Sequence, residues 1–377
     1  MSININRPII TYENIALLKS DFPAYSAESN SGDNISFLPL IQSVNFSFDI
    51  DRINTASLGT KSFVNQSIAK APDINLTINS FEDFGDLFSS MFTNMAVRSN
   101  LDFDRNFYAV IGNERGVDVY GSNLSGKDVI GFGNCFLKDI SMSQSVNGVI
   151  NSSYSFVGSN VEAQTLLQNG SIFSGKCPAL NLSGNQSQDL DFQISQISGS
   201  SSVINTVVPH YSTNVTISGN GSVGNFLIKS DSIQDFSLDL PINRKDIYGI
   251  GKKYPLTRKS VFPNEGNFNF SNKVSAFEVS GLRANLKDFL NSEESYTLNI
   301  SGKNYGARAF NIQINEARFK SQGNSLSISQ ELNSELSFNF DIHKCEVQIP
   351  GVSGSLLLEN SSNLLLSDNG FIILEQG

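Results

Sequence analysis

The sequence contains an internal repeat, and this feature constrains the fold more than any other. Residues 47–50 (SFDI) recur as residues 237–240 (SLDL), and Gly59 recurs as Gly249 at the same spacing along the chain. In both places an alternating segment runs into a polar loop that contains basic residues. Because a repeat means that one structural unit is used twice, we expect two copies of a single domain.

Two further matches keep the same order. Residues 75–78 (NLTI) match residues 267–270 (NFNF), and residues 141–147 (SMSQSVN) match residues 327–333 (SISQELN), at nearly the same spacing. Preserved order and similar spacing argue against chance similarity. The sequence therefore predicts a first unit at residues 1–165, a linker or inserted loop at 166–200, a second unit at 201–345 and a C-terminal tail at 346–377.

Both units are predicted to be mainly β, each a β-sandwich with one packed α-helix. Charged residues make up only 16% of the chain, and the 28 Phe residues must supply much of the core because Trp is absent. Phe and β-branched residues favour strands. Apolar residues recur at helical spacing from Phe84 to Met95 and from Leu282 to Leu290, which predicts one amphipathic helix in each unit. In the tail, apolar triplets at regular intervals predict a short β-rich segment.

Charge and cysteine content exclude several classes of protein. The formal net charge of −10 argues against general nucleic-acid binding, which needs an excess of Lys and Arg. The three cysteines are odd in number and far apart, so neither a disulfide framework nor a zinc ribbon is expected. No signal-peptide pattern and no long apolar run is present. We expect synthesis in a reducing cytoplasm and no membrane insertion.

Two glycine-rich segments resemble nucleotide-binding motifs in letters alone. Residues 121–127 (GSNLSGK) lack the Ser or Thr that completes a P-loop, since Asp128 follows. Residues 219–224 (GNGSVG) fit the dinucleotide pattern, but apolar segments at 215–217 and 226–228 flank them as two strands, where that motif requires a strand and a helix. Both segments are predicted to be hairpin turns.

No other pattern indicates catalysis or metal binding. The segment from Asp102 begins like a calcium loop but lacks the central Gly and the final Glu. Only His210 and His343 are available for a hydrolytic triad or a zinc site. We therefore predict no catalytic, cofactor-binding or metal-binding residues, and a protein that is not an enzyme.

The repeated strands separate an apolar face from a polar one by their period of two. In the first copy Val44, Phe46, Phe48 and Ile50 share one face. The opposite face carries short, neutral or acidic side chains without Lys or Arg, which is typical either of an ordinary solvent-exposed surface or of a channel wall along which DNA slides. The candidate lumen-facing residues are Ser43, Asn45, Ser47, Asp49, Asp235, Ser237 and Asp239.

Basic residues gather in the loops that follow these strands. The loops are either solvated hairpin tips or arms that dock on an acidic neighbouring ring. The candidate inter-ring residues are Arg52, Lys61, Arg244, Lys245, Lys252, Lys253 and Arg258.

Residues 135–147 (CFLKDISMSQSVN), continuing to 153–160 (SYSFVGSN), resemble the closing segment of the bacteriophage tail tube protein family. The order of strand, long loop, returning strand, helix and closing strand pair is similar as well. The resemblance implies that each copy adds strands to a continuous inner barrel and that the long loop packs on the next ring. It brings no catalytic residues and no cofactor.

The same resemblance implies the partners and the location. Stacked rings would form a conduit for genome ejection in the virion tail, with DNA passing through without sequence-specific binding. Two copies per chain would let three chains form a pseudo-sixfold ring. Further copies of the chain and other tail proteins would be its partners, after synthesis in the host cytoplasm.

Two alternatives remain open. The insertion at 166–200 and the C-terminal tail depart from a simple tube subunit, and they would suit another virion structural protein at the baseplate, tail tip or neck. A bacterial surface or carbohydrate-binding β-protein would have a similar composition, but the lack of a signal-peptide pattern disfavours it.

Overall fold

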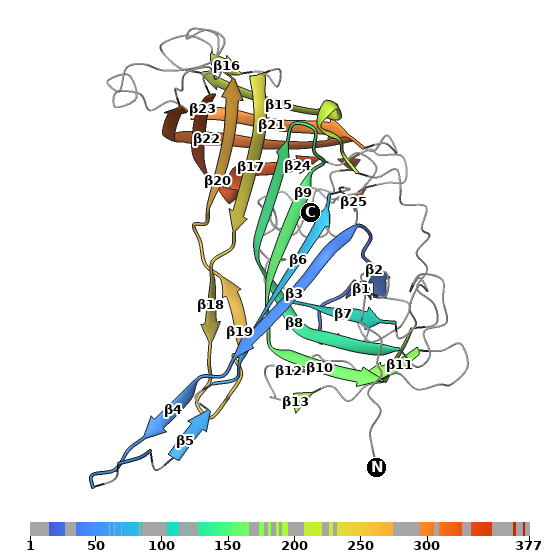
Figure 1. Cartoon of the computed structure of the whole chain (residues 1–377), viewed down its shortest axis with the longest axis vertical. Helices are drawn as coiled ribbons and strands as arrows, with labels where there is room; N and C mark the ends of the chain where they lie inside the picture. Colours follow the sequence, from blue (N-terminus) through green and yellow to red (C-terminus); the bar gives the residue numbers. More distant parts are fainter. Residues whose placement is uncertain are drawn as a thin grey trace.

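Figure 1 presents a computed structural model of the chain. The described residues are 15–26, 35–59, 61–63, 65–68, 70–82, 84, 104–112, 119, 127–165, 173–176, 180–181, 186–187, 191–194, 207–220, 226–228, 232–273, 295–304, 309–325, 333–348, 365–366 and 372–373.

The fold is mainly β and its sheets are antiparallel. The first ten strands are β1 (Ile15–Ser20), β2 (Ile35–Phe37), β3 (Ile41–Asp49), β4 (Arg52–Thr55), β5 (Asn65–Ile68), β6 (Asp73–Phe81), β7 (Arg105–Ile111), β8 (Asp128–Ser145), β9 (Asn151–Gly158) and β10 (Asn160–Thr165). The later set is β15 (Thr213–Asn220), β16 (Phe226–Ile228), β17 (Ile233–Pro241), β18 (Arg244–Ile247), β19 (Thr257–Ser260), β20 (Glu265–Lys273), β21 (Ser295–Lys303), β22 (Ala309–Ser325), β23 (Asn333–Asp341) and β24 (Cys345–Gln348).

Every strand pairing among β1–β10 recurs among β15–β24. Pairs β1–β2 and β1–β7 recur as β15–β16 and β15–β21. The ladder β3–β6–β9–β8 recurs as β17–β20–β23–β22. The hairpin β4–β5 recurs as β18–β19, and β7–β8 and β8–β10 recur as β21–β22 and β22–β24. We refer to β1–β10 as unit 1 and to β15–β24 as unit 2.

Irregularities in the ladders recur at the same places. The β3–β6 register shifts between Ile41 and Ser43, and the β17–β20 register shifts at the equivalent point, between Ile233 and Asp235. The β8–β9 shift at residues 137–139 likewise recurs in β22–β23 at residues 319–321. Since a bulge locally reorients a strand, its recurrence fixes which residues of the two units are equivalent.

These registers correct two of the sequence matches. The spacing predicted from NLTI and NFNF holds for the whole of β3–β6 and β17–β20, so Gly59 corresponds to Gly251 and not to Gly249. Both glycines have positive φ, 87° and 79°. The bulges of β8 and β22, at residues 137–139 and 319–321, are closer in sequence than the match of SMSQSVN with SISQELN predicts. Gly323, and not Ser327, is therefore the counterpart of Ser141. An alternating Ser pattern matches itself after a slip by an even number of positions, because such a slip preserves the faces.

The long strands β8 and β22 each connect two sheets. The first half of β8 pairs with β7 and β10, and its second half pairs with β9. Apolar side chains fill the space between the two layers of unit 1: the ring of Phe107 in β7 lies 4.7 Å, centroid to centroid, from that of Phe156 in β9, and both are buried. β22 makes the equivalent pairings with β21, β24 and β23.

One sheet runs without interruption through both units, in the order β22-β23-β20-β17-β8-β9-β6-β3. The units join where β17 pairs with β8, with Leu238 opposite Met142 and Leu240 opposite Ile140. All four side chains are buried. We call these eight strands the continuous sheet, and β22 and β3 are its two terminal strands.

The remaining described segments are short. β11 (Phe173–Lys176) pairs with β14 (Asp191–Ile194), and β12 (Leu180–Asn181) pairs with β13 (Gln186–Ser187), within the segment predicted to be a linker or inserted loop. β24 continues past the predicted boundary at residue 345. In the tail, β25 (Leu365–Leu366) and β26 (Ile372–Ile373) form a pair.

Both predicted helices fall on residues that the structure leaves undescribed, apart from Phe84. That residue is buried, and its ring stacks on Phe310 of unit 2 with centroids 3.7 Å apart. Across the described ranges no helix has the length and apolar character needed to cross a membrane.

Candidate functional site: the polar sheet face and the hairpin arms

Rows of polar residues cross the continuous sheet on one face. Directly opposed residues of neighbouring strands share a face, so each row can be followed from partner to partner. One row consists of Ser43, Asn79, Ser153, Ser141, Asp239, Asn267 and Asn339. A second row consists of Ser143, Ser237, Asn269 and Ser337.

The candidate lumen-facing residues all belong to this polar face. Ser43, Asn45, Ser47 and Asp49 alternate along β3 beyond its bulge, and Asp235, Ser237 and Asp239 do so along β17. The sheet thus brings together, on one surface, residues that the sequence placed in two separate units.

Hydrogen bonds between neighbouring strands hold these short side chains together. Asn79 Nδ2 donates to Ser43 Oγ over 2.8 Å, and Asn269 Nδ2 donates to Ser237 Oγ over 3.3 Å. Ser337 Oγ donates to Asn269 Oδ1 over 2.6 Å. A face whose polar groups bond to one another offers fewer groups to a passing ligand.

The expectation that this face lacks cations does not hold at β22. Arg318 is the ladder partner of Asn339, and Lys320 Nζ donates to Asn267 Oδ1 over 3.2 Å. The sequence match had placed the equivalent strand at residues 327–333, so residues 318–325 were not considered part of the polar face.

An acidic pair lies at the junction of the units. Asp139 in β8 opposes Pro241, close along β17 to Asp239. Partial burial and the charge of Asp239 raise the pKa of the Asp139 carboxyl above its ordinary value of 3.8. Two carboxyl groups thus lie close together on the polar face where β8 meets β17.

Two hairpin arms extend from the same end of the sheet, β4–β5 after strand β3 and β18–β19 after strand β17 (Figure 1). Leu58 and Ile250 at their tips are fully exposed, with relative accessibilities of 104% and 108%. Each precedes a positive-φ glycine, Gly59 or Gly251. The sequence did not reveal these two tips as equivalent, because it paired Gly59 with Gly249 and so did not align Leu58 with Ile250.

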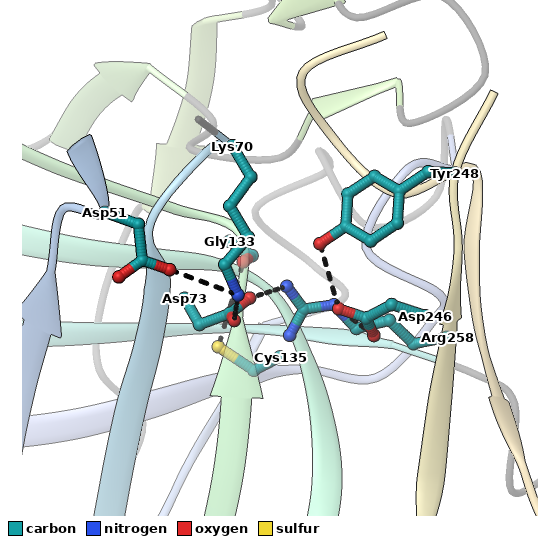
Figure 2. Close-up of polar contacts among 8 residues, drawn as sticks. All are labelled: Asp51, Lys70, Asp73, Gly133, Cys135, Asp246, Tyr248 and Arg258. Atoms are coloured by element: carbon teal, nitrogen blue, oxygen red, sulfur yellow. Dashed lines mark hydrogen bonds and ion pairs between the residues drawn. The ribbon is translucent and has the colours of Figure 1, made fainter. Parts of the chain in front are cut away.

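A polar cluster anchors the second arm on unit 1 (Figure 2). Arg258 in β19 is only 1% exposed, and its Nη2 lies 2.5 Å from Asp73 Oδ1 in β6. Its Nε lies 3.6 Å from Asp246 Oδ1 in β18. Lys70 Nζ lies 3.0 Å from Asp73 Oδ2 and 3.8 Å from Asp51 Oδ2.

Asp73 is held in its ionised form by these cations. Partial burial, the largest influence, would raise the pKa of its carboxyl, but the hydrogen bond from Lys70 and the charges of Arg258 and Lys70 lower that pKa overall. The cluster is a structural ion-pair network and connects two units far apart in sequence.

Arg244 anchors the same arm through backbone groups. Its Nε donates to the carbonyl oxygen of Leu137 over 2.7 Å, and its Nη1 donates to that of Arg258 over 3.0 Å. Its guanidinium lies 5.2 Å from the centre of the Phe136 ring, within cation–π range. Among the candidate inter-ring residues, Arg244 and Arg258 therefore make contacts within the chain, whereas Arg52, Lys61, Lys245, Lys252 and Lys253 are exposed.

Groups capable of other chemistry are few. β15 and β16 pair antiparallel across residues 219–224, which confirms the predicted hairpin. Burial raises the pKa of the Cys345 thiol to about 12 and that of Cys135 as well, so neither thiol is a ready nucleophile. No group of three His, Cys, Asp or Glu that could hold a metal ion occurs within the described ranges. Residues 121–126 lie outside them.

Comparison with known proteins gives structural likenesses only. No family model matches the chain, and no curated protein sequence matches it significantly. Among solved structures, the SPP1 tail tube is 11% identical with a TM-score of 0.31, covering 42% of this chain and 81% of that one. A sheath-tube complex of an extracellular contractile injection system, PVC, is 17% identical with a TM-score of 0.28, covering 40% of this chain and 99% of that one. The anti-feeding prophage cap is 13% identical with a TM-score of 0.25, covering 38% and 91%.

Proposed function

We propose that this chain is a structural subunit of a bacteriophage tail tube, which assembles into stacked rings that form the conduit for genome ejection. The observation that carries the proposal is the β17–β8 junction, where two units with the same strand pairings join side by side in one continuous sheet. Units that join side by side through their sheets can add further copies in the same way until the sheet closes around a central axis.

The recurring pairings support a duplicated β-sandwich domain. Unit 1 contributes β8-β9-β6-β3 to the continuous sheet, and unit 2 contributes β22-β23-β20-β17 in the same order. We place the domains at residues 1–165 and 201–345, with β24 extending the second, and the tail after it. Three chains would supply six units for a closed pseudo-sixfold ring.

In such a ring the polar sheet face lines the lumen. Its Ser and Asn side chains are short and bonded to one another, and Asp139, Asp235 and Asp239 add negative charge. Stable DNA binding requires cations that replace the counterions around phosphate. Arg318 and Lys320 at β22 are outnumbered on this face by the neutral and acidic side chains, and Lys320 is bonded to Asn267, so such a lumen lets DNA pass without sequence-specific binding.

The hairpin arms suit contacts between rings. Both project from the same end of the sheet (Figure 1). Leu58 and Ile250, in the loops that connect the two strands of each arm, are fully exposed. Each arm also exposes further apolar side chains, Ile53, Phe63 and Ile68 on the first and Ile247 and Leu256 on the second, and clustered exposed apolar residues favour burial against another protein. The exposed cations Arg52, Lys61, Lys245, Lys252 and Lys253 lie along the same two arms and suit an acidic surface on the neighbouring ring.

Electron microscopy of the negatively stained, purified chain tests this function. Tubes or stacked rings are the expected result, and threefold averaging should show six similar densities in each ring. A chain that stays monomeric at high concentration would refute the proposal.

A second candidate, a terminal ring or baseplate component, is favoured by one observation. The inserted segment is fastened to unit 1, since Asn134 Nδ2 donates to the carbonyl oxygen of Leu180 over 3.1 Å and the Leu180 amide donates to Asn134 Oδ1 over 2.6 Å. A segment held there can serve contacts that a plain tube subunit does not need. Single rings that never stack would support this candidate.

A further inference from the structure

One terminal strand of the continuous sheet exposes apolar residues that are buried in its counterpart. Phe46, Phe48 and Ile50 of unit 1 are 44%, 48% and 42% exposed. Their equivalents in unit 2, Leu238, Leu240 and Ile242, are 0%, 0% and 2% exposed. The two strands differ in their neighbours, because β17 has β8 beside it, whereas β3 pairs only with β6 among the strands that the structure describes.

The sequence of β3 makes this edge unusual for a free strand. Natural edge strands are commonly protected by Lys, Pro or a short length. β3 reads IQSVNFSFD, a long strand without Lys, Arg or Pro, and its bulge lies between Ile41 and Ser43, before the segment from Asn45 to Asp49. Such a strand is built to be covered by a pairing partner.

The β17–β8 junction supplies the geometry of that partner. It places Ser237 opposite Ser143, Asp239 opposite Ser141 and Pro241 opposite Asp139. When β17 is replaced by β3 and β8 by its equivalent β22, the same register pairs Asn45 with Ser325, Ser47 with Gly323 and Asp49 with Ser321. β22 is the other terminal strand of the same sheet.

We propose that β3 of one chain pairs antiparallel with residues 321–325 of β22 in a second copy of the chain, with Ser47 opposite Gly323. This pairing repeats the internal junction between chains and covers Phe46, Phe48 and Ile50. The equivalence of the two units and the exposure of β3 support the strand pairing. Only the closure of the ring rests on the proposed function.

The junction between chains differs chemically from the internal one. Arg52 is the counterpart of Arg244, so it reaches across to the backbone of the second copy near Phe319, the counterpart of Leu137. Gln66 and Glu265 replace the ion pair of Arg258 and Asp73. Asn324 and Gln322 replace Met142 and Ile140 beside the apolar side chains. The junction between chains is therefore more polar than the internal junction. When the assembly is destabilised, the chains should separate before the two units of one chain do.

Cysteine pairing tests the register. Opposed residues in an antiparallel pair have Cα atoms about 4.5–5.5 Å apart, a separation that a disulfide allows. Position 323 accepts a side chain, because a Cβ added at Gly323 meets nothing closer than 3.9 Å. Within one chain the two positions lie on opposite terminal strands, seven strand spacings or roughly 33 Å apart along the sheet, so a second copy must supply the partner.

Cys135 and Cys345 are buried, so the remaining native cysteine, Cys177, is first replaced by Ser. In this Cys177→Ser background, chains carrying Ser47→Cys are mixed with chains carrying Gly323→Cys and mildly oxidised. We expect a covalent dimer from the mixture and none from either chain alone. A chain carrying both substitutions should form a covalent ladder that stops at a closed ring. The control pairs Ser47→Cys with Gln322→Cys, which a shift of one residue places on the opposite face of the sheet, and it should not cross-link.

The outcomes separate this inference from the proposed function. If tubes form but their chains do not cross-link in this register, the strand pairing is wrong and the proposed tube function is unaffected. Cross-linked chains that never form tubes support the pairing and refute the tube. Monomers without cross-links, in which another segment of the same chain protects β3, overturn both.

Discussion

Arg258 of unit 2 donates from Nη2 to Asp73 Oδ1 of unit 1 over 2.5 Å, although the two residues are far apart in sequence. The guanidinium is almost fully buried, and its Nε and Nη1 atoms make no hydrogen bond. Loss of Asp73 would leave a buried cation without its best partner. This contact ties the second arm to the body of the molecule.

Arg258→Gln should release the second arm. We expect a loss of about 3 kcal/mol in the free energy of unfolding, because one partner of a buried ion pair is removed. Urea unfolding measures the loss, and amide hydrogen exchange should show faster exchange in β18–β19. Gln66→Ala, at the exposed counterpart in the first arm, is the matched control and should change stability by less than about 0.5 kcal/mol. Equal effects of the two substitutions would contradict the anchoring role.

Asp139→Asn should make the protein more stable at neutral pH. The folded-state pKa of Asp139 is raised by burial and by Asp239, so its contribution to stability is present below pH 3.8 and is lost as the pH rises through the folded-state value. The side-chain amide of the variant does not ionise, so the variant does not lose this stability as the pH rises. Thermal unfolding from about pH 3 to about pH 7 should show the two proteins diverging as the pH increases.

Asp239→Asn serves as the control for this electrostatic pair. Without the neighbouring charge, the pKa of Asp139 should move back toward its ordinary value, although burial still raises it. A pH profile unchanged by either substitution would show that the two carboxyls do not interact.

Leu58→Ser combined with Ile250→Ser should stop rings from stacking. Both side chains are fully exposed, so the stability of the isolated chain should change by less than about 0.5 kcal/mol. Electron microscopy should then show rings in place of tubes. Leu58→Met with Ile250→Val keeps the tips apolar and should still give tubes. Normal tubes from the Ser variant would exclude the tips as stacking contacts.

Phe48→Ala and Leu240→Ala should have different effects at equivalent positions. Leu240 is fully buried at the internal junction, and its truncation should cost about 2–5 kcal/mol in unfolding free energy. Phe48 is half exposed, so its truncation should cost less in the isolated chain and weaken association between chains. Sedimentation velocity and urea unfolding separate the two effects. Loss of stability with unchanged association in Phe48→Ala would argue against a partner on β3.

The sequence alone determined the features that depend on neighbouring residues. The period of two placed Ser43, Asn45, Ser47 and Asp49 on one side of a strand, and the structure keeps them there because side chains alternate whatever the strand pairs with. The paired strands around residues 219–224 could be predicted for the same local reason. The recurring pattern was visible as well, and its match between residues 75–78 and 267–270 had the register that the strand pairs show, whereas the matches of Gly59 and Ser141 did not.

Only the tertiary structure decided which strands lie together and which cations are used internally. Ser-rich alternation fits its own copy after a slip by an even number of positions, so the counterpart of Ser141 could not be fixed until bulges at residues 137–139 and 319–321 set the register. Likewise Arg258 looked like its exposed neighbours in the loop. Its burial follows from β17 pairing with β8, which brings β19 against Asp73, and a contact between residues so distant in sequence leaves no local trace.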